Sequence, residues 1–390
     1  MPGDREYDVV LFGATGFTGG LTADYLAANG PEDLRWALVG RNRAKLEAVA
    51  ARLAAAKPVA PPPALIEADA ADAAALAKVA ESTRVVITTV GPYALYGGPL
   101  VAACAAAGTD YVDLTGEPEF VDRMWLDNHA TAERSGARLI HCCGFDSVPH
   151  DLGAYFTVKQ LPEGVPLTVN GYVRSNARFS GGTYHSAVNA FGRVRQTLGA
   201  ARARKAAEPR AAGRKISSAP ARIRRDEELG GWTVPLPTID PTIVRRSAAA
   251  VDRYGPEFTY GHNAVVRHLA TVAGATAGIG AVAVLAPIPP TRKLLLKAKS
   301  PGDGPDEATR AGSWFKLRFV GEGGGKRVVT EVSGGDPGYS ETAKMLAQCG
   351  LCLAFDDLPE RAGQLTTVAA MGDMLLTRLQ DAGIRFRVLR

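Results

Sequence analysis

A glycine-rich segment near the N-terminus constrains the fold of this chain most strongly. Residues 8–12 form an apolar run typical of a buried strand, and Gly13, Gly16 and Gly19 follow at three-residue spacing, where a helix is predicted to begin. The first glycine permits a tight turn, the second lets backbone approach a phosphate, and the third lets the helix pack close to the sheet. The helix start adds unpaired N–H groups and the positive end of the helix dipole. The segment predicts a dinucleotide site, with an ordinary glycine-rich turn as the alternative.

The residues after the second predicted strand indicate which dinucleotide binds. NAD-selective folds place an Asp or Glu here, bonded to the ribose 2′-hydroxyl. In this chain residues 35–39 lead instead to Arg41, with Asn42, Arg43 and Lys45 close behind. A guanidinium binds a 2′-phosphate through charge-assisted hydrogen bonds, whereas a carboxylate repels it. We therefore predict NADP(H), with Arg41 as the main contact. In the alternative interpretation these charges only solvate the start of the next helix.

The first third of the chain alternates between strand and helix patterns. This alternation predicts a parallel sheet with crossover helices, an α/β fold of the doubly wound Rossmann type. Asp69 ends the third predicted strand, and Gly91 and Pro92 follow the fourth at the edge where such sheets bind ligands, so all three join the cofactor-binding candidates. The predicted strands are 8–12, 35–39, 64–68, 85–90, 111–114 and 138–142, and the predicted helices are 18–29, 43–56, 71–81, 99–108 and one ending near residue 136.

The pattern changes after Asp151 and indicates a second domain, as expected for a chain of 390 residues. We expect a Rossmann domain at 1–152, an α+β substrate or dimerisation domain at 153–335, and a C-terminal segment at 336–390 whose helices return to the first domain. The predicted elements are strand 167–175, loop 176–184, helix 186–204, a hairpin of 314–320 with 326–333, helices 341–353 and 366–380, and strand 385–389.

Two segments of the second domain indicate which partners the chain binds. Residues 193–225 hold eleven Lys or Arg and one acidic residue, although the whole chain carries only +5. This basic loop suits an acidic carrier protein or anionic lipid, and a solvated, partly disordered loop is the alternative. It lacks the interleaved aromatics of a nucleic-acid site. Residues 265–289 are apolar but rich in Ala and Gly, which leaves a membrane-spanning helix, a membrane-surface or acyl-facing helix pair and a buried helix open. Lys293, Lys297 and Lys299 follow and suit anionic headgroups.

The cysteines and the N-terminus predict a location. Five cysteines, an odd number without disulfide spacing, accompany a short charged N-terminus unlike a signal peptide. We expect a cytoplasmic protein, with peripheral contact at the inner face of the plasma membrane as the alternative. Cys349 and Cys352 have redox-motif spacing, but apolar flanks indicate a buried helix. No His or Cys set has metal-ligand spacing, so no metal is predicted.

Three side chains after the fourth and sixth predicted strands are candidates for acid–base chemistry. Tyr93 presents a phenol at the ligand edge, or is a packing aromatic. Asp146 and His150 lie in a polar turn, 144–151, where His150 is a candidate proton donor near neutral pH. The alternative is that this turn only caps the next helix. We expect Asp113 and Glu117 to bind loop N–H groups rather than substrate.

Five short groups of residues carry a family resemblance. They read GATGFTG at 13–19, VGR at 39–41, VGPY at 90–93, YVDLTGE at 111–117 and CGFDSVP at 143–149. Together they resemble the saccharopine dehydrogenase-like oxidoreductases, and within these most closely the trans-acting enoyl reductases. The resemblance is strongest over 7–153 and returns at 338–345. It departs from the family where a Thr-Pro-Ala near the last helix is Thr-Val-Ala at 367–369.

The resemblance implies a cofactor loop, a reaction and partners. It places the cofactor loop on Gly13, Thr15, Gly16, Phe17, Thr18 and Gly19, and the NADP-selecting position on Arg41. It implies reduction of a carbon–carbon double bond in an acyl thioester, carried by an acyl carrier protein or a polyketide synthase that lacks a working reductase, in lipid or glycolipid assembly. It supplies no catalytic acid. A saccharopine dehydrogenase-like amino-acid or imine oxidoreductase, a non-catalytic NADP-binding membrane scaffold, and a homodimer stay open.

Overall fold

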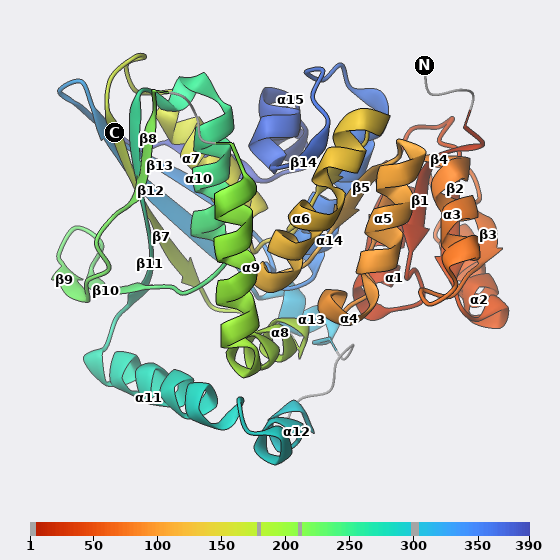
Figure 1. Cartoon of the computed structure of the whole chain (residues 1–390), viewed down its shortest axis with the longest axis horizontal. Coiled ribbons are helices and arrows are strands. Elements are labelled where there is room, and N and C mark those ends of the chain that lie inside the picture. The colour runs from red at the N-terminus through yellow and green to blue at the C-terminus, as the bar shows by residue number, and fades with distance from the viewer. Residues whose placement is uncertain (1–4, 178–180, 210–212, 298–303) are drawn as a thin grey trace.

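The computed structural model describes residues 5–177, 181–209, 213–297 and 304–390. Within these ranges the strands form two sheets, one of seven strands and one of eight. Figure 1 shows the seven-stranded sheet with its helices at the right and the eight-stranded sheet at the left, with α11 and α12 below them. The two sheets belong to an α/β fold with a second, mixed-sheet domain, as predicted.

The first sheet is parallel and has the strand order β3-β2-β1-β4-β5-β6-β14. Its first six strands follow the doubly wound Rossmann order, which confirms the predicted fold. The chain reverses direction across the sheet between β1 and β4, and this switch point places a ligand crevice at the carboxyl ends of the strands. The strands are β1 (Tyr7–Phe12), β2 (Trp36–Gly40), β3 (Ala64–Glu67), β4 (Thr83–Thr88), β5 (Asp110–Asp113), β6 (Arg138–Ile140) and β14 (Gly363–Leu365).

Helices cover both faces of this sheet, so its strands are apolar on both sides. Val9 and Leu11 of β1 belong to one core cluster, and Val10 and Phe12 belong to another on the opposite face. The helices of this half are α1 (Phe17–Asn29), α2 (Arg43–Ala55), α3 (Ala73–Ser82), α4 (Tyr93–Tyr96), α5 (Gly98–Ala107), α6 (Pro118–Ser135) and α7 (Val148–Val158).

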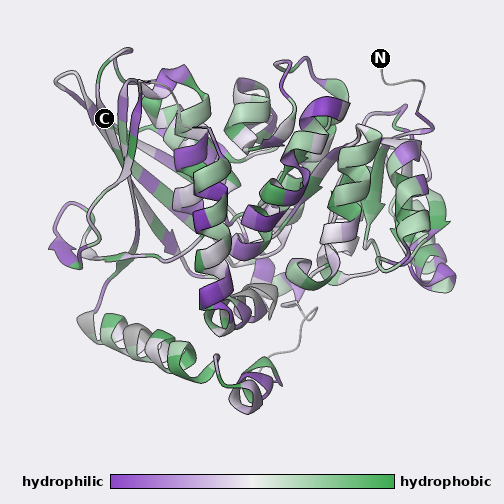
Figure 2. Ribbon diagram, viewed as in Figure 1, coloured by the Kyte–Doolittle hydropathy of each residue, from purple (hydrophilic) through white to green (hydrophobic). Residues whose placement is uncertain are grey.

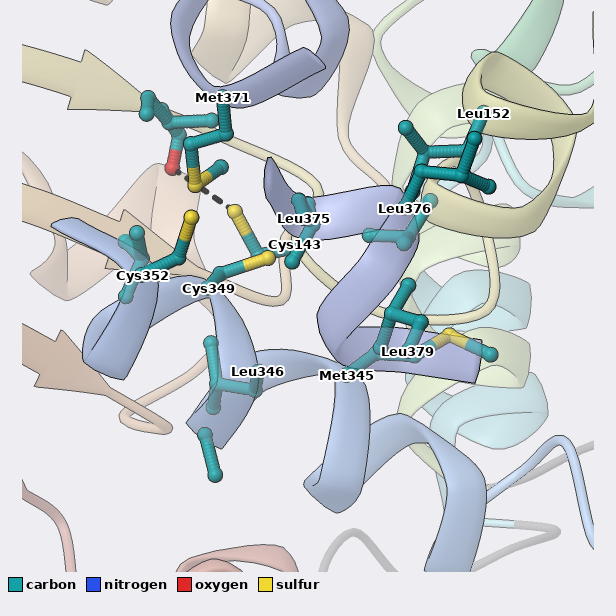
Figure 3. Packing of buried hydrophobic residues seen from close by; sticks show 14 of the residues in the cluster. Cys143, Leu152, Met345, Leu346, Cys349, Cys352, Met371, Leu375, Leu376 and Leu379 are labelled. Atoms are coloured by element: carbon teal, nitrogen blue, oxygen red, sulfur yellow. Dashed lines mark hydrogen bonds between the residues drawn. The ribbon is translucent and has the colours of Figure 1, made fainter. Parts of the chain in front are cut away.

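The C-terminal helices α14 (Ser340–Phe355) and α15 (Thr367–Asp381) return to the first sheet, as predicted. Figure 3 shows Cys349 and Cys352 of α14 packed among Cys143, Met371 and neighbouring leucines. All five cysteines are buried and free. The Cys349 and Cys352 thiols therefore fill a core, as their apolar flanks indicated.

The C-terminal segment also contributes to both sheets, which the sequence interpretation missed. Strand β14 extends the first sheet beside β6, whereas β15 (Arg385–Val388) pairs with β13 of the second sheet. Phe386 is buried there and belongs to the main core cluster. The expectation that the whole segment 336–390 packs on the first domain is therefore wrong for its last strand, because burial of Phe386 and the open edge of β13 favour the second sheet.

The second sheet has the order β15-β13-β12-β7-β11-β10-β9, and β8 pairs with β11. Strand β7 (Leu167–Ser175) and the hairpin of β12 (Phe315–Gly323) with β13 (Lys326–Gly334) lie where they were predicted. The remaining elements are β8 (Lys215–Ser218), β9 (Arg224–Asp226), β10 (Gly231–Pro235), α10 (Asp240–Ala250), the 3₁₀ turn Asp252–Tyr254, β11 (Glu257–Val266) and α13 (Glu307–Ala311).

The predicted helix 186–204 is two helices, α8 (Gly181–Gly192) and α9 (Val194–Ala207). The break falls at Arg193, whose guanidinium donates two hydrogen bonds of 2.6 Å to Glu119 of α6. Beyond α9 the basic loop contributes β8 and β9 to the second sheet, so its described part is more ordered than expected. Residues 178–180, Arg210 and Lys299, which were part of predicted segments, lie outside the described residues.

The apolar segment 265–289 forms α11 (Leu269–Leu285), followed by α12 (Pro289–Lys297). Figure 2 shows α11 as a largely apolar helix set apart from both sheets. Its Ile279, Val284 and Leu285 side chains are 46 %, 69 % and 38 % exposed, so the buried-helix alternative is wrong. Among the described residues, none of the helices is both long and apolar enough to cross a membrane.

Candidate active site

The glycine loop between β1 and α1 has the geometry of a phosphate cradle. Gly13 adopts φ +91°, and a Cβ on it would lie 2.7 Å from Val90 and 2.8 Å from the Thr89 hydroxyl. A Cβ on Gly19 would overlap the Gly13 carbonyl oxygen. Gly16 is the N-cap of α1 and brings no side-chain acceptor to the first turn. Gly13 and Gly19 therefore let the loop pack against the strand ends and the helix without side chains, which leaves the start of α1 as the part suited to a pyrophosphate.

Arg41 lies at the end of β2 with a largely free guanidinium. Its side chain is 77 % exposed, and its Nη1 is 3.9 Å from Asp69 Oδ2, which is half exposed. An exposed pair of this length contributes little, about 0–1 kcal/mol, so an incoming phosphate displaces it easily. Asn42 caps α2 by accepting the Lys45 backbone N–H, and Asp69 accepts that of Ala71. Asn42 and Asp69 thus order the chain after β2 and β3, beside the exposed Arg41 guanidinium.

Tyr93 does not present its phenol to the crevice, contrary to the sequence expectation. Gly91 and Pro92 lead into α4, and the Tyr93 ring is buried beneath them. Its hydroxyl donates to the Thr88 carbonyl at 3.1 Å and accepts the Leu114 N–H at 3.2 Å. Burial raises the pKa of Tyr93 well above its usual range. The ring therefore ties the fourth-strand loop to the fifth-strand loop.

The two acids expected to be structural bind loop N–H groups, as predicted. Glu117 accepts the backbone N–H groups of Tyr93 and Ala94, each at 3.1 Å. Asp113 accepts those of Thr115 and Cys142 and lies 2.6 Å from His141 Nδ1. These carboxylates hold the loops that follow β4, β5 and β6 in register.

His150 lies inside a helix rather than in an open turn. Helix α7 begins at Val148, with Pro149 in its first turn, a position that proline favours. The His150 ring is buried, and burial lowers its pKa to about 3 despite a hydrogen bond to the backbone of Phe145. The ring is therefore neutral at physiological pH, and the expectation that it donates a proton near neutral pH is wrong for this structure.

Asp146 occupies the turn between β6 and α7. Its Oδ2 lies 3.0 Å from where a Cβ on Gly116 would be, so it faces the loop after β5. Burial, and then the charge of Asp240, raise the pKa of Asp146 to about 7. Among the three acid–base candidates, Asp146 alone combines a place at the ligand edge of the sheet with a pKa suited to proton transfer at neutral pH.

A segment before the second-domain hairpin covers the glycine loop. The Arg310 guanidinium stacks 5.5 Å from the centre of the Phe17 ring, and the Tyr339 ring meets Phe17 edge-on at 5.0 Å. A Cβ on Gly304 would overlap the Phe17 ring. The sequence interpretation missed this contact, because Arg310 lies almost 300 residues from the loop and carries no local signal. It places second-domain residues against the cofactor cradle.

Comparison with known proteins identifies relatives of this chain. Residues 9–140 match the saccharopine dehydrogenase NADP-binding domain. The chain is 38 % identical over 416 residues to a putative trans-acting enoyl reductase of Mycobacterium tuberculosis, covering 99 % of this chain and 98 % of that protein. It is 36 % identical to the trans-acting enoyl reductase of Mycobacterium ulcerans, covering 97 % of each. Among solved structures, apo saccharopine dehydrogenase from Saccharomyces cerevisiae matches with TM-score 0.57 at 14 % identity, covering 98 % of this chain and 100 % of that one.

Proposed function

The chain belongs to the family of trans-acting enoyl reductases and is an NADP-dependent oxidoreductase, and we propose that it reduces a carbon–carbon double bond conjugated to an acyl thioester. The observation that carries this proposal is the likeness to named enoyl reductases over nearly the whole of both chains. The glycine cradle and the free Arg41 guanidinium support NADPH as the reductant. A polyketide or fatty acyl chain in lipid assembly is the substrate class that we propose.

The reaction requires the protein to position the cofactor and the substrate and to stabilise the charge that develops on the substrate. Bound NADPH supplies a hydride, which the β-carbon of the substrate accepts. The loop of Gly13, Gly16 and Gly19 would hold the pyrophosphate, and Arg41 would hold the 2′-phosphate. The negative charge that develops on the thioester oxygen must then be relieved by a proton at the α-carbon. Asp146 holds that proton in our proposal, because its raised pKa keeps it protonated up to about pH 7.

Replacement of Asp146 tests this assignment. We expect Asp146→Asn to lower kcat/KM by about 100-fold, the lower range for loss of a general acid. In the parent enzyme kcat/KM should fall as pH rises through about 7, because the carboxyl then loses the proton it donates. The variant should lack this decline. Asp127→Asn on the exposed face of α6 is the matched control and should keep the parent profile. An unchanged rate and pH profile in Asp146→Asn would remove Asp146 from the reaction.

The reaction itself is tested with a substituted cofactor. NADPH deuterated at C4 and a 2-enoyl pantetheine thioester should give one oxidised cofactor per saturated product, with deuterium on the β-carbon. Turnover of an imine or an amino acid, without enoyl reduction, would favour saccharopine-type chemistry. Tight NADPH binding without turnover of either acceptor class would favour the non-catalytic scaffold.

A surface for an acidic carrier protein is proposed on α9. Several cations of the basic loop are paired within the chain: Arg193 with Glu119, Arg204 with Asp122 and Glu208, and Lys215 with Glu257. Arg195, Arg202 and Lys205 are instead exposed on α9. Exposed cations raise the encounter rate with an acidic partner in a salt-dependent way.

We expect the triple Glu variant of Arg195, Arg202 and Lys205 to raise KM for a carrier-bound enoyl substrate by about tenfold at low ionic strength. KM for the pantetheine thioester should not change, and salt should erase the difference. The charge-matched triple variant Lys78→Glu, Arg134→Glu and Arg385→Glu, on other elements, controls for net charge. A carrier-dependent rate that is insensitive to salt would exclude docking by α9.

Peripheral contact with an anionic membrane is proposed for α11 and α12. Ile279 and Val284 of α11 and Leu294 of α12 are exposed, the last to 70 %, and Lys293 and Lys297 of α12 add exposed cations. Apolar side chains beside cations suit the boundary between acyl chains and anionic headgroups, at about 1 kcal/mol per cation.

Vesicle co-sedimentation tests this contact. The protein should sediment with vesicles containing phosphatidylserine and less with phosphatidylcholine alone. Ile279→Glu with Val284→Glu should abolish the difference, while Leu126→Glu on α6, another exposed apolar position, should not. Equal sedimentation of all variants would refute the proposal, and a concentration-dependent dimer lost in the double variant would assign the same face to a second copy.

A further inference from the structure

Three buried side chains of metal-binding type lie close together, although no metal is predicted from the sequence. His150 comes from α7, Asp240 begins α10, and His262 lies in β11. They are 3 %, 2 % and 7 % exposed. Because these three elements are far apart in the sequence, the residues have no short ligand spacing from which a metal site could be predicted.

The three groups meet through atoms that bind metals. His150 Nδ1 is 3.1 Å from Asp240 Oδ1, and His262 Nε2 is 3.6 Å from Asp240 Oδ2. One ligand atom from each residue lies within 4.8 Å of the other two. Tetrahedral zinc, with bonds of about 2.0–2.1 Å, separates its ligand atoms by about 3.3 Å. The two histidines approach different oxygens of Asp240 at 3.1 and 3.6 Å, so a shared ion requires the three side chains to close in slightly on one another.

Two of these atoms are unsatisfied as they stand. His150 Nδ1 and Asp240 Oδ1 are buried and lack a hydrogen-bond partner, although they lie 3.1 Å apart. A buried polar atom without a partner is destabilising, and a carboxylate more so. An ion between them removes this cost, because both atoms then direct lone pairs at a cation.

The outer contact of the His262 ring also suits a metal ligand. Metal-bound histidines commonly use the other ring nitrogen in a hydrogen bond that fixes their orientation. His262 Nδ1 lies 3.5 Å from the Tyr260 hydroxyl, which leaves Nε2 for Asp240 and the ion. We propose that His150, Asp240 and His262 bind one divalent transition-metal ion of the Zn²⁺ class, with a fourth position open to water. Two imidazoles and one carboxylate are a ligand set that zinc accepts.

Metal content of the purified, tag-free protein tests the site. Protein expressed with added Zn²⁺ should hold about one zinc per chain after gel filtration. Protein stripped with a chelator and loaded with Co²⁺ should show the visible absorption bands of a tetrahedral site, and added Zn²⁺ should erase them. Zn²⁺ should also raise the melting temperature of the stripped protein by several degrees. The pH profile predicted for Asp146 is measured on the metal-stripped protein, because zinc bound to Asp240 would offset the charge that helps raise the pKa of Asp146.

Variants identify the ligands. His262→Gln and Asp240→Asn should each reduce bound zinc at least tenfold, with folding checked by circular dichroism. His268→Gln, an exposed histidine ahead of α11, is the control and should keep one zinc. A parent protein with less than a tenth of an equivalent of metal, no cobalt bands and no thermal shift would overturn the proposal, as would zinc retained in both ligand variants. These measurements need no substrate, so a negative result for metal binding would not contradict the proposed reaction.

Discussion

Arg41→Asp is expected to weaken NADPH binding by at least about 100-fold and to change NADH binding by no more than about threefold. The substitution removes a charge-assisted hydrogen bond to the 2′-phosphate, worth about 1.5–3 kcal/mol, and adds repulsion between two anions. A factor of 100 corresponds to about 2.8 kcal/mol. NADH has no phosphate at this position, and an Asp here offers its ribose hydroxyl an acceptor.

Calorimetric titration of both coenzymes measures this selectivity directly. Arg43→Asp is the matched control, because the Arg43 guanidinium is already held by Glu47 at 3.0 Å and by the Leu65 carbonyl at 3.1 Å. It should reduce NADPH affinity only slightly. Equal losses for NADPH and NADH in Arg41→Asp would take Arg41 out of the 2′-phosphate site.

Local signals were enough for most strands and helices of the nucleotide half of the molecule, although not for β14. Strands such as β1 and β2 are short apolar runs, and some helix starts carry a local cue, such as Asp72 capping α3 by accepting the Ala74 and Ala75 N–H groups. The right-handed crossover rule then limits these elements to a few arrangements, of which the Rossmann order is one. The glycine spacing and Arg41 are equally local, so the cradle and its cofactor were predictable from the sequence.

The rest of the site depends on contacts that no local pattern reveals. Tyr93 looked like a donor because it follows a strand, yet the Thr88 carbonyl and the Leu114 N–H draw its hydroxyl inward. His150 looked like an exposed acid, but Asp240 and His262 arrive from distant elements and enclose it. Burial sets the pKa of such groups, and burial is a property of tertiary packing.

The partners of charged side chains also depend on tertiary packing and cannot be identified from a local pattern. The basic loop looked solvated because its acidic partners lie outside it: Glu119 and Asp122 on α6 are neutralised by Arg193 and Arg204. The acids on the buried side of α6 are therefore paired with Arg193, at the break between α8 and α9, and with Arg204 of α9. Composition counted these cations as surface charge, whereas the fold uses several of them as internal counter-ions.

A second large effect is expected for a substitution at Gly19, because the glycine loop packs closely against the sheet. Gly19→Ala should weaken NADPH binding by about 10–100-fold and lower the melting temperature of the protein without cofactor. The added Cβ would overlap the Gly13 carbonyl oxygen and lie 2.8 Å from the Thr89 hydroxyl, and backbone cannot yield as a flexible side chain does. Relief of such an overlap costs about 1–3 kcal/mol and moves the first turn of α1 away from the phosphate.

Gly20→Ala is a control one residue further along the same helix. Its Cβ would meet Arg52 Nη2 at 3.6 Å and the Ala14 carbonyl oxygen at 4.0 Å, which are ordinary contacts. Alanine also favours a helix over glycine by about 1 kcal/mol, so this variant should bind NADPH normally and melt at the same or a higher temperature. Comparison of the two variants distinguishes the effect of close packing at Gly19 from the effect of alanine on helix stability. If both variants bind NADPH alike, the packing of α1 against Gly13 does not position the phosphate site.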